Sequence, residues 1–394
     1  MRGLSLFLPV VWATSIIANK NILFAAQSNG NLTSLSLQNS SIAVTSNTVD
    51  CADNASWLTL DAHNKILYCL NRGVGNATQG SLNSFAVGKQ GVLTKIDRVS
   101  APFGVVAGQY FDVGGKRGYV TASYNRSAIA VYSFGQNGDL DEPLQIIYPN
   151  ISQTGPIPSR QDRSFSHHVI LDPTGQFILI PDLGGDLIRV FKYDKENIAP
   201  LTELSPLVTE PGAGPRHAVF WKSYKRHGEL FLFFNGELSQ KVYSYKVTYT
   251  GTGLSFTKVF DVPALDAQLP SNTAPTSEIA ISPDSRFLIV ASRERSFASS
   301  PLFRTGPSDT LSTFKLNQDG TLSLVQTAPS GGYLPRQFSL NRKGDRVAVG
   351  HQGNNTVVVW KRDIRSGKII SEADGGKVGS QTLSGQVAFV QWYE

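Results

Sequence analysis

The stretch that decides the fold reads His168-Val-Ile-Leu-Asp-Pro-Thr-Gly175, then Phe177-Ile-Leu-Ile180, then Leu187-Ile-Arg-Val-Phe-Lys-Tyr193. Each run is short and apolar, and Pro or Gly marks the turns between the runs. The stretch therefore predicts a strand, a tight turn, a second strand, another turn and a third strand. No segment of the chain shows sustained helical periodicity, so a helical repeat protein is not favoured.

The same pattern recurs along the chain. A close copy is Glu278-Ile-Ala-Ile-Ser-Pro-Asp284 followed by Phe287-Leu-Ile-Val290. Units of this kind start at Trp57, Gly104, His168, His217, Glu278 and Gln337. Units of about four short strands that repeat every 40 to 60 residues or so are typical of propeller blades.

The two ends of the chain supply the remaining blade. Ile22-Leu-Phe24 and Leu35-Ser-Leu37 form part of a sheet, and Gln386-Val-Ala-Phe-Val-Gln391 can pair with it. This pairing would close the ring and remove its open strand edges. We therefore predict an all-β fold, a seven-bladed β-propeller closed by its N- and C-terminal strands. A pair of β-sandwiches is the alternative, but sandwiches would not repeat one strand-turn-strand pattern six times.

The N-terminus has the features of a secretory signal peptide. Arg2 precedes an apolar run from Leu4 to Ala18, and charge returns at Lys20. We expect residues 1–18 to be removed and residues 19–394 to form a single propeller domain. No later segment is long and apolar enough to span a membrane. Seven Asn-x-Ser/Thr sequons support a secreted glycoprotein with N-linked glycans: Asn31, Asn39, Asn54, Asn76, Asn125, Asn150 and Asn354.

Cysteine use and charge exclude other classes. Cys51 and Cys69 are the only cysteines, and in an oxidising compartment we predict that they form a disulfide. Two cysteines without a Cys-x-x-Cys spacing make a poor zinc site, and no metal or cofactor is expected. The net charge of +6 comes from scattered Lys and Arg, so nucleic acid is not expected as a partner. We expect a monomer with no membrane partner.

Polar residues converge at one end of the predicted ring. An inner strand and its hairpin partner place the start of the first strand beside the end of the second. We call the end of the ring where the inner strands start the mouth. Five residues stand at first-strand starts, namely His167, His168, Arg216, His217 and Arg336, and four at second-strand ends, namely Asp182, Glu237, Arg293 and His351.

Four motifs resemble the lactonase family of seven-bladed propellers, which contains bacterial 6-phosphogluconolactonases and fungal carboxy-cis,cis-muconate cyclases. They are Gly214-Pro-Arg-His217, Ser277-Glu-Ile-Ala-Ile-Ser-Pro-Asp284, Pro181-Asp-Leu-Gly-Gly-Asp186 and Pro335-Arg-Gln-Phe338. The resemblance covers roughly residues 20 to 393. It implies an active site formed by a histidine, two arginines and a glutamate, which fall on His167, Arg216, Arg293 and Glu237.

Lactone hydrolysis needs a base for water, a cationic group for the developing oxyanion, and an acid for the leaving ring oxygen. We assign Glu237 as the base, Arg216 and Arg293 as oxygen clamps, and His167 as proton donor or second base. Further substrate contacts are expected from Arg336, His168, Asp182 and His217. A structural interpretation is also open for several residues. Glu237 and its arginines can form a buried ion pair that only supports the fold. His217 and His351 can be packed or hydrogen-bonded structural residues, and Asp182 can bind a loop amide.

Three functions fit this sequence. The first is an extracellular hydrolase of sugar-derived aldonolactones, the second a muconate-type cycloisomerase that uses the same site, and the third a non-catalytic secreted glycoprotein that serves as a binding platform. Fold alone does not choose among them. Export favours unphosphorylated aldonolactones made outside the cell, because phosphogluconolactone and muconate belong to intracellular pathways.

Overall fold

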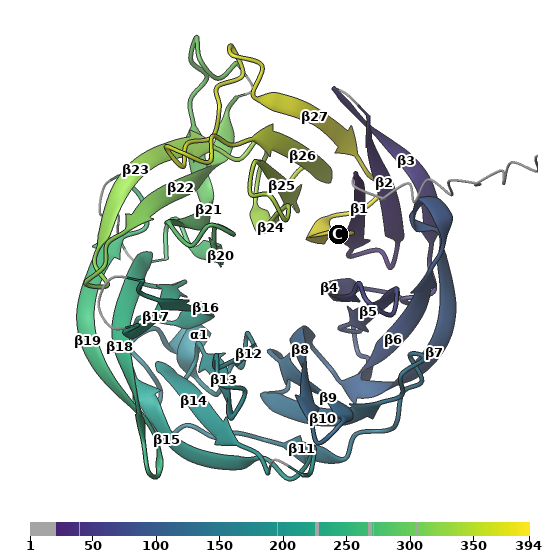
Figure 1. Cartoon of the computed structure of the whole chain (residues 1–394), viewed down its shortest axis with the longest axis vertical. Coiled ribbons are helices and arrows are strands. Elements are labelled where there is room, and N and C mark those ends of the chain that lie inside the picture. The colour runs from purple at the N-terminus through teal and green to yellow at the C-terminus, as the bar shows by residue number, and fades with distance from the viewer. Residues whose placement is uncertain are drawn as a thin grey trace, which may run out of the picture.

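The computed structural model describes residues 21–394 apart from residues 39, 195, 225–227, 267–269, 271 and 305, and describes residues 294–296 by their backbone only. The predicted signal peptide and the sequon at Asn39 lie outside the described residues. Strands dominate the described chain, and they are arranged as sheets around a central axis (Figure 1).

The described strands form seven four-stranded sheets. The sheet that joins the chain ends contains β28 (Val387–Trp392), β1 (Ile22–Gln27), β2 (Leu32–Gln38) and β3 (Ser41–Thr48). The next two contain β4 (Ala55–Asp61), β5 (Ile66–Asn71), β6 (Gln79–Val87) and β7 (Leu93–Pro102), and then β8 (Val105–Val113), β9 (Lys116–Ser123), β10 (Ala128–Phe134) and β11 (Gln145–Ile147).

The remaining four sheets follow in chain order. The first contains β12 (Ile170–Leu171), β13 (Phe177–Asp182), β14 (Leu187–Lys192) and β15 (Thr202–Val208), and the second contains β16 (Pro215–Lys222), β17 (Leu230–Gly236), β18 (Lys241–Thr250) and β19 (Gly253–Pro263). The third contains β20 (Thr276–Ile281), β21 (Phe287–Phe297), β22 (Ser308–Leu316) and β23 (Leu322–Pro329), and the fourth contains β24 (Pro335–Leu340), β25 (Arg346–His351), β26 (Thr356–Lys361) and β27 (Lys377–Thr382). Two short helical turns, η1 (Lys89–Gly91) and α1 (Pro158–Gln161), lie in the connections.

This arrangement confirms the predicted seven-bladed β-propeller. The six repeat units correspond to the sheets that start with β4, β8, β12, β16, β20 and β24, whose first strands lie innermost (Figure 1). The predicted ring closure is also confirmed, because β28 pairs antiparallel with β1 in the register Leu23↔Trp392 and Ala25↔Val390.

Apolar clusters fill the space between neighbouring sheets. One cluster joins Phe111 and Val120 of the β8–β11 sheet to Ile178 and Phe191 of the β12–β15 sheet. Both faces of a blade are therefore covered, which explains why β1 is buried at all six positions instead of alternating. Truncation of one such buried side chain to alanine costs about 2–5 kcal/mol.

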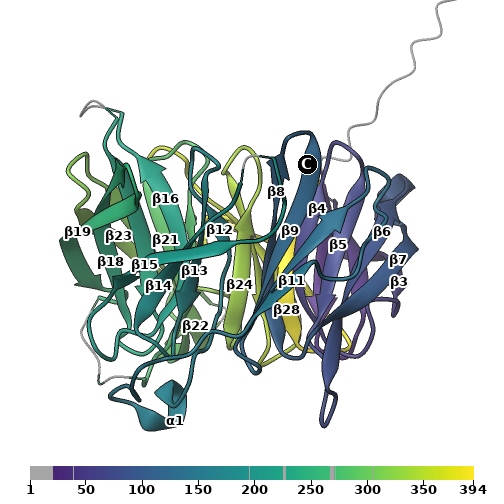
Figure 2. The same cartoon turned by 90° about the horizontal axis from the view of Figure 1, so that it is seen from below.

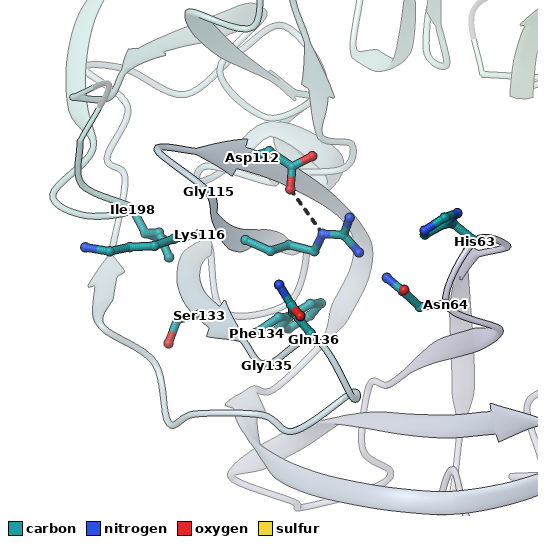
Figure 3. A pocket seen from close by; sticks show the side chains of 11 residues that line it. His63, Asn64, Asp112, Gly115, Lys116, Ser133, Phe134, Gly135, Gln136 and Ile198 are labelled. Atoms are coloured by element: carbon teal, nitrogen blue, oxygen red, sulfur yellow. Dashed lines mark hydrogen bonds and ion pairs between the residues drawn. The ribbon is translucent and has the colours of Figure 1, made fainter.

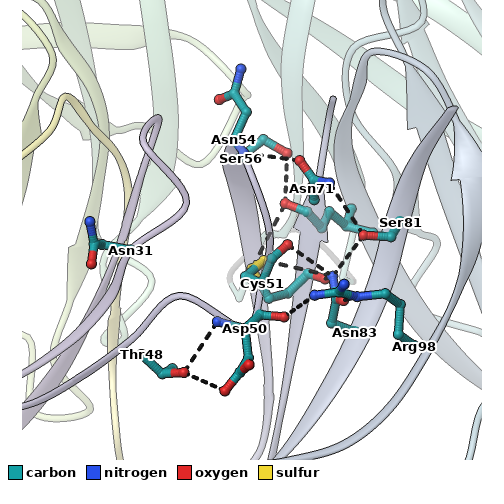
Figure 4. Close-up of a disulfide and its surroundings, with 12 residues drawn as sticks. Asn31, Thr48, Asp50, Cys51, Asn54, Ser56, Asn71, Ser81, Asn83 and Arg98 are labelled. Carbon is teal, nitrogen blue, oxygen red and sulfur yellow. Dashed lines mark hydrogen bonds between the residues drawn. A yellow bond between two sulfur atoms is a disulfide. The ribbon is translucent and has the colours of Figure 1, made fainter. Parts of the chain in front are cut away.

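The predicted disulfide is confirmed. Cys51 and Cys69 are bonded and fully buried, and Asn83 donates its amide to the backbone carbonyls of both (Figure 4). The bond ties the segment before β4 to the middle of β5 across 18 residues of sequence. A closed loop of that length stabilises the fold by about 3 kcal/mol in the chain-entropy model.

Candidate active site

Bulges at the starts of the inner strands create the candidate site. The register of several inner strands shifts by one residue near the mouth, as between Ala55 and Trp57 or between Pro215 and His217. A bulged residue leaves the ladder and can be turned away from the sheet. Residues skipped in this way include Ser56, Val106, Arg216, Arg336 and Ala388.

These five skipped residues line one small cavity on the central axis. The cavity measures about 10 Å³, which is close to the least that one water molecule needs. Three of the skipped residues are small or apolar, whereas Arg216 and Arg336 are cations. The polar groups of the site are therefore concentrated on one side of the ring.

Glu237 is the centre of that polar side. It follows β17, and its carboxylate lies 2.8 Å from Arg216 Nε, 3.1 Å from Arg293 Nη2 and 2.5 Å from Arg160 Nη2. The Arg216 Nε–H is poorly aligned for a hydrogen bond despite the short ion pair. The structure thus brings together the predicted Glu237, Arg216 and Arg293.

The ion pairs determine the charge of Glu237. Burial alone would raise the pKa of this carboxyl, but the charges of Arg293, Arg216 and Arg160 outweigh burial and lower the pKa to about 2. Burial lowers the pKa of Arg216 to about 10, although Glu237 opposes this shift. At neutral pH the Glu237 carboxylate and the Arg216 guanidinium are therefore both charged.

Arg160 is a site residue that the sequence analysis missed. It lies in α1, which projects from one end of the ring (Figure 2), and its ion pair with Glu237 shows that this end is the mouth. Besides Glu237, it contacts Tyr124 Oη at 3.4 Å and Asn272 Oδ1 at 3.3 Å. The connection between β11 and β12 carries no strand periodicity, so only the three-dimensional fold shows that it reaches the mouth.

Arg336 differs from the other arginines of the site. Among the described residues it has neither a hydrogen bond nor an ion pair, and its side chain is only partly exposed. Burial and the nearby charges of Arg216, Arg72 and Arg293 hold the pKa of its guanidinium well below the usual value. The Arg336 guanidinium therefore meets repulsion from neighbouring arginines that no ion pair of its own offsets among the described residues.

Three histidines line the same region. The rings of His168 and His217 stack with centroids 4.3 Å apart, and His167 meets His217 edge-on at 5.2 Å. Trp57 covers His168 and His217 at 5.5 and 5.8 Å. Burial, followed by neighbouring positive charge, holds the pKa of each imidazole well below its usual value, so all three are neutral. Nδ1 of His167 is buried and has no hydrogen-bond partner among the described residues.

Asp182 and His351 are occupied by structural contacts. The fully buried Asp182 carboxylate accepts hydrogen bonds from Ser164, from the backbone N–H of Phe165 and from Arg189. This matches the loop-binding interpretation of Asp182. His351 is fully buried and contacts Ser330 Oγ at 3.1 Å through Nε2.

Glu278 is the second residue that the site gains from the structure. In the sequence, Glu278 stands out only as the start of a repeat unit. Its Oε1 lies 2.9 Å from His217 Nδ1, and its side chain is buried. Two register positions between Thr276 and Ile279 are skipped, and this irregularity places Glu278 next to His217.

A larger surface hollow of about 580 Å³ contains none of these residues (Figure 3). Its lining includes His63 and Asn64 from the β4–β5 turn and Lys116 from the start of β9. These turns close the hairpins at the end of the ring opposite the mouth. Arg117 in the hollow is paired with Asp61 and with Asp112.

The described residues contain no group of three or more His, Cys, Asp or Glu side chains placed to hold a metal ion. None of the helices within the described ranges is long and apolar enough to cross a membrane.

The fold and the site together define a propeller enzyme whose cationic mouth suits a small, oxygen-rich molecule. The chain belongs to the seven-bladed β-propeller lactonase family, whose model matches residues 21–388. By family, the protein is a lactone hydrolase.

Curated relatives agree with this assignment, and a solved structure shares the fold. A probable 6-phosphogluconolactonase of Arthroderma benhamiae is 28% identical over 91% of this chain and 87% of its own length. The 6-phosphogluconolactonase of Bacillus subtilis is 25% identical over 80% of this chain and 82% of its own. The periplasmic gluconolactonase of Pseudomonas aeruginosa has the same fold, with a TM-score of 0.77, 23% identity and coverage of 94% and 98% of the two chains.

Proposed function

We propose that the protein hydrolyses the ring ester of a sugar-derived aldonolactone at the mouth, outside the cell. The observation that carries this proposal is the buried Glu237 carboxylate held among three guanidiniums, with His167 close to the same site. Water adds to the lactone carbonyl carbon and loses a proton, the ring C–O bond breaks, and the ring oxygen takes up a proton. The product is an open-chain aldonate.

The site residues supply the groups that these steps need. Arg216 and Arg293 hold the carbonyl oxygen as it becomes negative, since a guanidinium can donate two hydrogen bonds from one charged group. Arg336 has no hydrogen bond or ion pair among the described residues, so its donors can bind a further oxygen of the substrate. His167 is neutral and its Nδ1 has no hydrogen-bond partner among the described residues, so it can act as a relay that passes the proton taken from water by Glu237 to the leaving oxygen.

Glu237 is a weak base while all three arginines hold it, because its pKa is about 2. Substrate oxygens compete for the same guanidinium donors. When they take over these hydrogen bonds, the guanidiniums stabilise the Glu237 carboxylate less. The pKa of Glu237 then rises, and the carboxylate becomes a stronger base. Arg160 is the most exposed of the three partners, with 27% of its side chain accessible, and is the one that a substrate displaces most readily.

Ring opening should be assayed side by side on gluconolactone, a disaccharide aldonolactone, 6-phosphogluconolactone and carboxymuconolactone. We expect turnover of the two unphosphorylated aldonolactones. Turnover of 6-phosphogluconolactone alone would overturn the proposal that the substrate is an extracellular, unphosphorylated aldonolactone. Turnover of carboxymuconolactone alone would favour the cycloisomerase. Inactivity on all four lactones would favour the binding platform.

Export rests on the N-terminal apolar run and on the sequons. Asn76, Asn125, Asn150 and Asn354 are exposed, so a glycosyltransferase can reach them. We expect the secreted chain to begin near Asn19 and to lose mass when an N-glycan-removing enzyme is added. An intracellular product that keeps residues 1–18 and shows no mass shift would refute the extracellular location.

Arg160→Ala should raise KM about ten-fold, because a charged hydrogen bond of roughly 1.5 kcal/mol is lost. It should also move the acid limb of the pH–rate profile upward, since one of the charges that lower the pKa of Glu237 is gone. The matched control is Arg163→Ala, a neighbouring arginine that is 59% exposed and pairs with Asp162. Identical kinetics for the two variants would exclude Arg160 from the site.

A further inference from the structure

Hydrogen bonds link three buried side chains, those of Glu278, His217 and Arg216, on the side of Arg216 away from Glu237. Glu278 Oε1 lies 2.9 Å from His217 Nδ1, and His217 Nε2 lies 3.1 Å from Arg216 Nη1. All three residues are buried, with exposed fractions of 6%, 2% and 1%. The steps proposed above for lactone hydrolysis assign no role to Glu278, and His217 was expected only as a substrate contact.

The donors and acceptors of these hydrogen bonds fit only one tautomer of His217. A guanidinium has no acceptor, so Arg216 Nη1 must donate and His217 Nε2 must accept. The proton of the neutral ring is then on Nδ1, where it points at the Glu278 carboxylate. The neutral state agrees with the lowered pKa of His217, which results from burial and from the charges of Arg216 and Arg336.

The same contacts fix the orientation of Arg216. Its Nη1 also donates to the backbone carbonyl of Ser277, the residue before Glu278. The stacked ring of His168 holds the plane of His217. The guanidinium is thus held by His217 of β16 and by the Ser277 carbonyl of β20, while its Nε faces Glu237 at 2.8 Å.

We propose that Glu278 is a positioning residue of the active site, which holds Arg216 in place for the lactone through His217. The kinetic part of this inference rests on the proposed function. The hydrogen-bond part does not, because it concerns only the free protein.

The buried surroundings of Glu278 bring the ionisation of its carboxyl close to neutral pH. Burial raises the pKa of Glu278 to about 7, although the charges of Arg216 and Arg336 and the backbone N–H of Ile279 oppose the shift. Glu237 and Arg293 also face His217 from the ends of β17 and β21. Above pH 7 the carboxylate is a strong acceptor for His217 Nδ1–H, whereas below it the neutral acid is a weaker one. Activity should therefore rise as pH passes through 7.

The test is Glu278→Gln, which keeps the size and an acceptor oxygen but cannot ionise. We expect kcat to fall about ten-fold above pH 7.5, because a charge-assisted hydrogen bond becomes a neutral one. The rise near pH 7 should disappear from the kcat/KM profile. The melting temperature at pH 8 should be equal or higher, since a buried charge has been removed. A merely structural role predicts a lower melting temperature and an unchanged profile.

The control is Glu203→Gln, an ion-paired glutamate on the outer strand β15 whose carboxylate contacts Arg189 at 2.7 Å. This variant should keep the wild-type profile. Nitrogen NMR of the histidine rings gives a second readout that needs no activity. His217 should carry its proton on Nδ1, and its signals should titrate near pH 7 in the wild type but not in Glu278→Gln.

The possible failures are distinguishable. If the wild type opens no lactone but His217 shows the expected tautomer and titration, the proposed function fails and the hydrogen bonds that link Glu278, His217 and Arg216 remain. If His217 carries its proton on Nε2, or if Glu278→Gln keeps the wild-type pH profile, the positioning role of Glu278 is refuted.

Discussion

Glu237→Gln should lower turnover at least about 100-fold, because the variant can neither accept the proton of water nor counter the charge of the surrounding arginines. The substitution preserves size, so the shape of the mouth is kept. Three guanidiniums lose their counter-charge, and we therefore also expect a lower free energy of unfolding. Turnover should be measured well below the melting temperature, where both proteins are folded.

The pH dependence separates the catalytic role of Glu237 from its role as an ion-pair partner. The pKa of Glu237 is about 2, so its ion pairs stabilise the fold above the unfolded value near 4.5 and lose this effect as the pH falls towards 2. In Glu237→Gln this acid-sensitive part of the stability should be absent. Normal turnover by the folded variant at neutral pH would remove Glu237 from the mechanism.

The fold could be predicted from sequence because blade packing leaves a local pattern. A strand buried on both faces appears as an apolar run, and each tight turn needs residues such as Pro173 and Gly175. Ring closure was predictable for the same reason, since the apolar run near residue 390 otherwise lacked a partner. The bulges could not be predicted, because a single residue that leaves the strand pairing does not change the pattern of apolar residues along the sequence.

From the sequence, the site could be predicted only for residues that lie at the starts of inner strands or at the ends of second strands. Arg216, Glu237 and Arg293 follow the rule that inner-strand starts and second-strand ends meet, and the structure brings them into contact. Arg160 comes from a connection without such a rule, so its 2.5 Å contact with Glu237 depends on how the connection folds back. Asp182 obeys the rule, yet its carboxylate is buried beneath the loops that it binds.

Arg216 and Arg336 occupy equivalent bulges but meet different surroundings, and this contrast predicts opposite effects on stability. Arg216 is 1% exposed and contacts Glu237, His217 and the carbonyl of Ser277. A lysine cannot make these contacts together, so Arg216→Lys should lower kcat/KM about 10- to 100-fold and reduce the melting temperature.

Arg336→Gln is the matched comparison, because Arg336 has no hydrogen bond or ion pair among the described residues and is surrounded by Arg216, Arg72 and Arg293. Removal of this uncompensated charge relieves repulsion, so the melting temperature should stay the same or rise. A donor for substrate oxygen is lost at the same time, and KM should increase about ten-fold. Thermal unfolding and lactone kinetics on both variants check the contrast. A melting temperature that falls equally in both, with KM unchanged in Arg336→Gln, would show that Arg336 supports the fold and not the substrate.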